Sequence, residues 1–366
     1  MYLRKNVLKN QYYRRPIDRY KHKIFFIPLL LVLFFACDNH SSVPKTEVET
    51  DKGFAKGADV SWITEMESQG KKFYNSQGEE MECMALLKSL GVNSIRLRVW
   101  VNPVDHGNWC NQSDVIVKAK RANALGMKLM IDFHYSDWWA DPGKQNKPAA
   151  WENFSLDELK NAVSNHTKDI LTALKQENIA PEWVQIGNET DNGMLWDTGK
   201  ASINMKNYAE LTQAGYDAAK SIFPDTKVIV HVSNGYNNSL FRWVFDGLKA
   251  NGAKWDVVGM SLYPSYAKDN GYNTWQDVND ACLSNINDMI ARYGTEVMIC
   301  EVGMPYTQAE DCKNFLTDLI NKSKSVPNNK VLGVFYWEPE CYNWNGYQLG
   351  AFDNTGKPSS AMDAFK

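Results

Sequence analysis

The chain has 366 residues, of which 44% are hydrophobic and 12% aromatic. This composition excludes an intrinsically disordered or collagen-like chain, and the length suffices for one large domain or two small ones. The formal net charge is -3, but residues 1–23 contain eight Lys or Arg and a single acidic residue, Asp18, so the rest of the chain carries -10. An acidic domain binds polyanions poorly, and we therefore expect no nucleic-acid partner.

The amino-terminal segment has the pattern of a secretory signal. The basic residues are followed by thirteen uncharged residues, 24–36, which are rich in Leu and Phe. This run is shorter than the roughly 20 apolar residues that a membrane span requires. Residues 34–37, with the sequence FFAC, resemble the cleavage box of bacterial lipoproteins, in which the Cys is acylated and becomes the first residue.

We therefore expect residues 1–36 to be a lipoprotein signal peptide, Cys37 to be the lipidation site, and the polar residues 37–52 to be a tether. The protein would then be exported and anchored by lipid to a bacterial membrane, in the periplasm or at the cell surface. A plain signal peptide followed by an unmodified Cys is the alternative.

Residues 53–366 contain no internal repeat and no second linker, and we interpret them as one domain. Six Cys lie in this region, and their spacing matches no zinc knuckle and no compact disulfide framework. Export would permit disulfides, but the sequence leaves their pairing open.

The elements of this domain alternate along the chain between short β-type runs and longer amphipathic stretches. The predicted strands are residues 57–62, 94–100, 128–135, 183–189, 227–233, 257–263, 296–303 and 332–339. Helical periodicity is clearest in residues 79–90, 156–176, 205–223, 275–292 and 309–323. Eight strands, each followed by a helix, predict an α/β fold with a single (β/α)8 TIM barrel. An open doubly wound sheet is disfavoured, because no glycine-rich phosphate turn follows the first strand.

Active sites of such barrels lie at the carboxyl ends of the strands, and two carboxylates lie at such ends here. Glu189 closes the fourth predicted strand and Glu301 lies near the end of the seventh. A pair of carboxyl groups cleaves glycosidic bonds, one as the acid and the other as the nucleophile or the base. Taken singly, each Glu could equally be a solvated or ion-paired side chain.

The neighbours of this pair bear on its chemistry, because the acid must stay protonated while the nucleophile is ionised. Arg96 and Arg98 share strand parity, so at least one should point into the barrel and favour an ionised carboxylate. His134 and Tyr263, at two other strand ends, could donate hydrogen bonds.

Tryptophan is abundant near the predicted strand ends. Indole rings suit the apolar faces of sugars, and the set predicts a saccharide groove, although packing is the alternative for each ring. These residues are Trp62, Trp100, Trp138, Trp139, Trp196, Trp337 and Trp344. Trp183 and Trp255 precede strand interiors, and we expect them in the core.

Other hydrolytic chemistries have little support in the sequence. No H-E-x-x-H motif and no G-x-S-x-G nucleophile elbow is present. A structural Ca²⁺ held by residues 340–353 is possible, because this segment offers carboxylates and carbonyl oxygens.

Five stretches of the sequence match a known family. They are GADVS (57–61), RLRVWVNP (96–103), DFHYSDWWADP (132–142), QIGNE (185–189) and EVGMP (301–305). Together they resemble family 53 of the glycoside hydrolases, the arabinogalactan endo-β-1,4-galactanases, over nearly all of residues 53–366. The match departs from the family pattern after Glu301, where a Thr is frequent and this chain has Val302 and then Met304 before Pro305.

The resemblance implies a role for each matching residue. Glu189 would be the acid/base, Glu301 the nucleophile, and Asn188 the ligand of the sugar 2-hydroxyl. The residues Arg98, His134, Tyr263 and Trp337 would support the reacting groups, and Asp59, Asp137, Trp138 and Trp139 would contact galactosyl units.

We thus expect a retaining, endo-acting hydrolase of β-1,4-galactosidic linkages in the galactan or arabinogalactan side chains of pectin. It should need no organic cofactor and act as a monomer. A related hydrolase of β-mannan, xylan or β-glucan is one alternative, because Asn188 and Glu189 do not select the sugar. A surface glycan-binding protein without turnover is the other, although it would need no acid and nucleophile pair.

Overall fold

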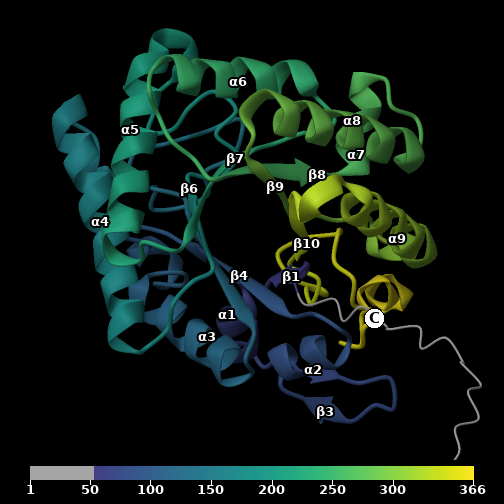
Figure 1. The fold of residues 1–366 in the computed structure, drawn as a ribbon. Coiled ribbons are helices and arrows are strands. Elements are labelled where there is room, and N and C mark those ends of the chain that lie inside the picture. The colour runs from purple at the N-terminus through teal and green to yellow at the C-terminus, as the bar shows by residue number, and fades with distance from the viewer. Residues whose placement is uncertain (1–52) are drawn as a thin grey trace, which may run out of the picture. The chain divides into compact units, whose positions relative to one another are not determined.

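The computed structural model describes residues 53–366, and the predicted signal peptide, the lipidation site Cys37 and the tether lie outside the described residues. Eight parallel strands close into a barrel in the order β1-β10-β9-β8-β7-β6-β5-β4, which confirms the predicted fold (Figure 1). The strands are β1 (Ala55–Asp59), β4 (Ser94–Val99), β5 (Lys128–Phe133), β6 (Trp183–Ile186), β7 (Lys227–Val232), β8 (Val257–Leu262), β9 (Glu296–Val302) and β10 (Val331–Trp337).

The interior of the barrel is filled with side chains. A separate apolar cluster lies inside it, consisting of Ala55, Met130, Trp183, Ile229, Val257, Met298, Cys300 and Phe335. Gly57 on β1 makes room for the phenyl ring of Phe335, because a Cβ at this position would lie 2.1 Å from Cδ1 of that ring. Trp183 is 2% exposed, as predicted for a core residue. This filled interior leaves ligand binding to the ends of the strands.

Helices surround the strands (Figure 1). They are α1 (Ile63–Ser68), α2 (Cys83–Ser89), α3 (Gln112–Ala124), α4 (Leu156–Gln176), α5 (Ala201–Ile222), α6 (Asn238–Ala250), α7 (Pro264–Ala267), α8 (Trp275–Tyr293) and α9 (Ala309–Ser325). The last strand is followed by a 3-10 helix, Ser360–Phe365, instead of an α-helix. Helix α4 begins with a capping box between Ser155 and Glu158, as its sequence favours.

The helix predicted over residues 79–90 is shorter than expected. Strand β3 (Glu80–Met81) instead pairs antiparallel with β2 (Phe73–Tyr74). The side chain of Glu82 accepts a hydrogen bond of 2.7 Å from the backbone N–H of Ala85. This N-cap starts α2 at Cys83, because it satisfies a helix donor that has no partner within the helix.

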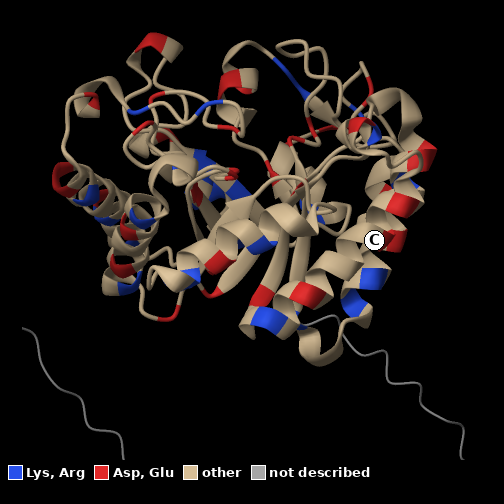
Figure 2. Ribbon diagram, turned by 90° about the horizontal axis from the view of Figure 1, so that it is seen from above, with Lys and Arg blue, Asp and Glu red and all other residues tan. Residues whose placement is uncertain are grey.

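The outer surface carries charges of both signs, which alternate along the surrounding helices (Figure 2). Within residues 53–366, no helix combines the length and apolar character that a membrane crossing needs. All six Cys of this region are buried as free thiols: Cys83, Cys110, Cys282, Cys300, Cys312 and Cys341.

Candidate active site

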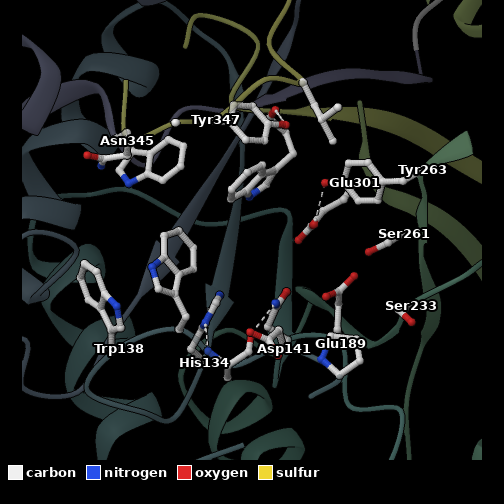
Figure 3. A pocket seen from close by; sticks show the side chains of 18 of the residues that line it. His134, Trp138, Asp141, Glu189, Ser233, Ser261, Tyr263, Glu301, Asn345 and Tyr347 are labelled. Atoms are coloured by element: carbon white, nitrogen blue, oxygen red, sulfur yellow. Dashed lines mark hydrogen bonds between the residues drawn. The ribbon is translucent and has the colours of Figure 1, made fainter. Parts of the chain in front are cut away.

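A pocket of about 1000 Å³ opens at the carboxyl ends of the strands. Both candidate carboxylates line it, and Figure 3 shows their carboxyl groups facing each other across the pocket. Glu301 lies on β9 and is 6% exposed. Glu189 follows β6 by three residues and has a φ of 44°, a left-handed conformation in the turn after the strand. The fold therefore brings together two groups that are more than 100 residues apart in the sequence.

Arg96 is the cation that contacts Glu301. Its guanidinium lies 2.9 Å from Oε1 of Glu301, 2.7 Å from Oδ2 of Asp59 and 2.9 Å from Oδ2 of Asp132. All of these side chains are almost completely buried. The arginine is thus shared by three carboxylates in a site of low dielectric, where it holds the orientation of Glu301 and favours its ionised form.

Arg98, which the resemblance places among the supporting residues, does not contact Glu301. Arg98 also points inward, but its guanidinium lies 3.4 Å from Oε1 of Glu338 and over the indole of Trp139, 4.1 Å from the ring centroid. Strand parity could not separate the two residues, because side chains at i and i+2 share a face. Arg96 and Arg98 lie at different heights along the barrel axis, and this height determines which side chains each guanidinium contacts.

The two carboxyl groups differ in their electrostatic surroundings. Burial raises the pKa of Glu189 well above its usual range, and the negative charge of Glu301 raises it further. Burial raises the pKa of Glu301 to about 7, an effect that Arg96 opposes. The pair therefore loses its first proton from Glu301, which leaves an ionised nucleophile opposite a protonated acid.

Tyr263 contacts the nucleophile directly. It follows β8, and its hydroxyl donates a hydrogen bond of 3.0 Å to Oε2 of Glu301 (Figure 3). Burial and the nearby Glu301 charge raise the pKa of this phenol, so it remains a donor. Arg96 and Tyr263 thus each engage one oxygen of Glu301.

Asn188 and His134 are fixed in position by their neighbours. The Asn188 side chain accepts a hydrogen bond of 3.0 Å from Arg96 and donates one of 2.9 Å to the carbonyl of Ala140. Nδ1 of His134 accepts from the Ala140 N–H at 3.1 Å, which leaves Nε2 to donate to Asp132 at 3.1 Å. Burial lowers the pKa of His134, in keeping with a neutral ring of one defined tautomer.

Aromatic rings form one side of the pocket. Trp62, Trp139 and Trp337 line it, and their ring centroids lie 5.2 to 5.9 Å apart. Trp138 also lines the pocket and stacks on His106, at the end away from Glu189 and Ser233 (Figure 3). A row of indoles beside polar groups is typical of sugar binding.

Three tryptophans predicted for the groove lie elsewhere. Trp100 is 1% exposed and packs under Trp138, and Trp344 is 6% exposed; neither lines the pocket. Trp196 lies in a neighbouring hollow. In the sequence, each of these tryptophans follows the end of a strand. Which of them reaches the groove depends on how the loop that carries it folds over the end of the barrel.

Two acidic residues predicted to contact sugar do not line the catalytic pocket. Asp59 is fully buried and binds Arg96 and the hydroxyl of Ser61. Asp137 accepts hydrogen bonds from the backbone N–H groups of Asn102 and Ala149, so it holds two loops together. Both residues thus shape the site from outside the catalytic pocket.

Several lining residues were not predicted. They include Trp109, Asp141, Ser233, Ser261, Tyr266, Asn345 and Tyr347. Ser261 shares strand parity with Tyr263, so the parity argument could have identified it. Trp109, Asn345 and Tyr347 lie within long loops, where the sequence gives no comparable signal.

The segment 340–353, named above as a possible calcium site, contains two acidic side chains, Glu340 and Asp353. Glu340 is fully buried beside Glu338, and burial raises the pKa of both groups, to about 8 for Glu338. Oδ1 of Asp353 accepts hydrogen bonds from its own turn, at the backbone N–H and the hydroxyl of Thr355. Within residues 53–366, no group of three or more His, Cys, Asp or Glu side chains is arranged to hold a metal ion.

The family model for glycosyl hydrolase family 53 matches residues 55–365. The chain belongs to this family. It is 32% identical over 339 residues to an arabinogalactan endo-β-1,4-galactanase of Thermothelomyces thermophilus, with 85% of this chain and 98% of the relative covered. A Niallia circulans protein described as uncharacterized is 34% identical over 358 residues, with 86% and 94% covered.

A solved structure agrees with this placement in family 53. The barrel is similar to a structure from a study of two fungal β-1,4-galactanases, with a TM-score of 0.77 and 30% identity. The similarity covers 86% of this chain and 99% of that one. The family 53 fold thus accounts for nearly all of the described residues.

Proposed function

We propose that this family 53 hydrolase is a retaining endo-β-1,4-galactanase that cleaves internal linkages of β-1,4-galactan and arabinogalactan. The observation that carries the proposal is the pair of facing carboxyl groups, Glu189 and Glu301, in one pocket at the strand ends. The galactanase relatives, which share about a third of their residues with this chain, support the choice of sugar.

In the proposed mechanism, ionised Glu301 attacks the anomeric carbon while protonated Glu189 donates its proton to the departing glycosidic oxygen. A covalent glycosyl-enzyme forms and the leaving chain is released. Glu189, now ionised, then removes a proton from water, which attacks the anomeric carbon and frees Glu301. No organic cofactor takes part in these steps.

The residues around the two carboxyl groups have separate roles in this mechanism. Arg96 and Tyr263 hold the two oxygens of Glu301, and the Asn188 amide is placed to bind the sugar 2-hydroxyl. Trp139 and Trp337 offer aromatic surface to the sugar rings. Calcium is left out of the proposal, because within residues 53–366 no group of three or more His, Cys, Asp or Glu side chains is arranged to hold a metal ion.

The first experiment replaces the nucleophile. We expect Glu301→Gln to abolish turnover while binding of galactan oligosaccharides persists, since the amide keeps the shape of the side chain but cannot attack. Undiminished activity would exclude Glu301 as the nucleophile. NMR of the first products should show a β-anomer, and an α-anomer would exclude retention.

A second experiment separates the proposal from its alternatives. Reducing ends are measured after incubation with β-1,4-galactan, β-mannan, xylan and β-glucan. Release from galactan is the expected result. Release from another polysaccharide would favour a related hydrolase, and binding without release would favour a glycan-binding protein.

We also propose that the enzyme is exported and anchored by lipid at Cys37, as a monomer facing the periplasm or the cell exterior. The basic, apolar and FFAC segments of residues 1–37 support this. Replacement of Cys37 by Ser should move the protein from the membrane fraction to the soluble fraction. Light scattering of the soluble variant would reveal its oligomeric state.

A further inference from the structure

A second hollow of about 680 Å³, the side pocket, adjoins the catalytic pocket and shares Trp138 and Trp139 with it. It lies between the loop that follows β5 and the loop that follows β6. Its lining residues are Ser136, Asp137, Trp138, Trp139, Lys144, Asn146, Lys147, Ala149, Glu152, Trp196 and Asp197. Its volume falls within the range of small-molecule sites.

The side pocket is tied to the catalytic centre. Gln145 is 1% exposed, and its amide donates hydrogen bonds to the backbone carbonyls of Asn188 at 2.8 Å and Glu189 at 3.3 Å. The backbone carbonyl of Gln145 in turn accepts a hydrogen bond of 2.7 Å from the backbone N–H of Trp196. One buried residue thus connects the turn that carries the acid/base to the far side of the side pocket.

Trp196 is held in place by its own contacts. Its indole N–H donates to the carbonyl of Asn192 at 2.9 Å, and Nζ of Lys200 lies over the ring, 4.4 Å from its centroid. Lys200 covers one face of this ring and does not itself line the side pocket. A fixed indole face is a suitable platform for a sugar ring.

The charges of the side pocket favour an uncharged ligand. Asp137, Glu152 and Asp197 outnumber Lys144 and Lys147 by one. Lys144 already pairs with Asp141 at 3.1 Å, and Lys147 donates to the backbone carbonyl of Glu152 at 3.2 Å. An anionic ligand would face three carboxylates against two ammonium groups that already have partners, whereas hydroxyl groups can bond to carboxylates, ammonium groups and the Asn146 amide alike.

We propose that the side pocket binds a neutral glycosyl substituent, such as arabinose, carried by the galactan unit that contacts Trp138 and Trp139. The shared indoles carry the argument, because a main chain in the catalytic pocket would direct a branch across them into the side pocket. This inference rests on the proposed galactanase function. It makes the side pocket a determinant of selectivity for branched over linear substrate.

The experiment compares linear β-1,4-galactan with arabinose-substituted galactan for the wild-type enzyme and Trp196→Ala. We expect kcat/KM on the substituted substrate to fall about tenfold, which corresponds to the loss of one stacking contact, and kcat/KM on the linear substrate to stay within about twofold. Trp243→Ala is the matched control, since Trp243 is 43% exposed on α6 and lines neither pocket.

Asn146→Ala removes a group that can bind a sugar hydroxyl in the same pocket. If Trp196→Ala does not fold, the same comparison of kcat/KM on the two substrates is made with Asn146→Ala. An equal loss on both substrates would show that the side pocket binds the main chain, and no loss on either would show that it binds no sugar; both results overturn the proposal. Failure of the wild-type enzyme to cleave linear galactan would instead overturn the proposed function.

Discussion

Arg96 and Arg98 lie two residues apart on one strand, are equally buried, and work in different surroundings. Arg96 contacts three carboxylates, including Glu301. Arg98 contacts one carboxylate, Glu338, and lies 4.1 to 5.7 Å from the centroids of three indole rings. The same type of side chain thus contacts the carboxylate of Glu301 at one level of the barrel and a cluster of indole rings at the next.

This comparison predicts that one substitution has different consequences at the two positions. Arg96→Met should lower kcat at least about a hundredfold, because it removes the cation that keeps Glu301 ionised and oriented. Without Arg96, the pKa of Glu301 rises, so the acidic limb of the pH–rate profile moves to higher pH. The profile of kcat against pH measures both effects.

Arg96→Lys is the control for this prediction, because it restores a positive charge without the planar guanidinium. We expect it to recover part of kcat and to move the acidic limb back toward lower pH. A wild-type acidic limb in Arg96→Met would contradict the role assigned to this residue.

Tyr263→Phe should have the next largest effect. It removes one hydrogen bond to an ionised carboxylate, and we expect kcat to fall about tenfold or more. The acidic limb should again move to higher pH, since the lost donor favoured ionised Glu301. Tyr293→Phe on α8 is the matched control, because it also removes a hydrogen bond to a carboxylate, that of Asp246 at 2.8 Å, but lines neither pocket; its kcat should remain near that of the wild type.

Arg98→Met should act on substrate binding more than on chemistry. The buried cation beside Trp62, Trp100 and Trp139 is lost, so the aromatic surface loosens and KM should rise about fivefold, while kcat changes less than about threefold. Glu338, whose pKa is already raised, can take up a proton and limit the cost in stability. A loss of kcat as large as that of Arg96→Met would remove the distinction between the two arginines.

Glu340→Gln should have the smallest effect, confined to stability. Because burial raises the folded-state pKa of Glu340, the folded protein binds more protons than the unfolded one above pH ~4.5, and stability falls as the pH rises from there. The amide abolishes this dependence. Thermal melts at pH 5 and pH 8 should show a Tm decrease that is a few degrees smaller in the variant than in the wild type.

Much of the fold could be predicted from the sequence, because each barrel strand is a short β-type run between turn residues. All eight predicted strands contain or overlap the observed ones. The helix over residues 79–90 was overextended, since its periodicity continues through Glu80 and Met81 although these residues pair with β2. Here the pairing partner, which is a tertiary feature, prevailed over local periodicity.

The sequence by itself determined the barrel, the two carboxyl groups and the richness in tryptophan, because strand periodicity and the ends of strands are local properties. Only the tertiary structure decided that Arg96 and not Arg98 contacts Glu301, that Asp59 and Asp137 lie outside the catalytic pocket, and that Trp196 lines a separate hollow. These outcomes depend on the level of each side chain within the barrel and on how long loops fold over it. Both are set by contacts between residues distant in the sequence.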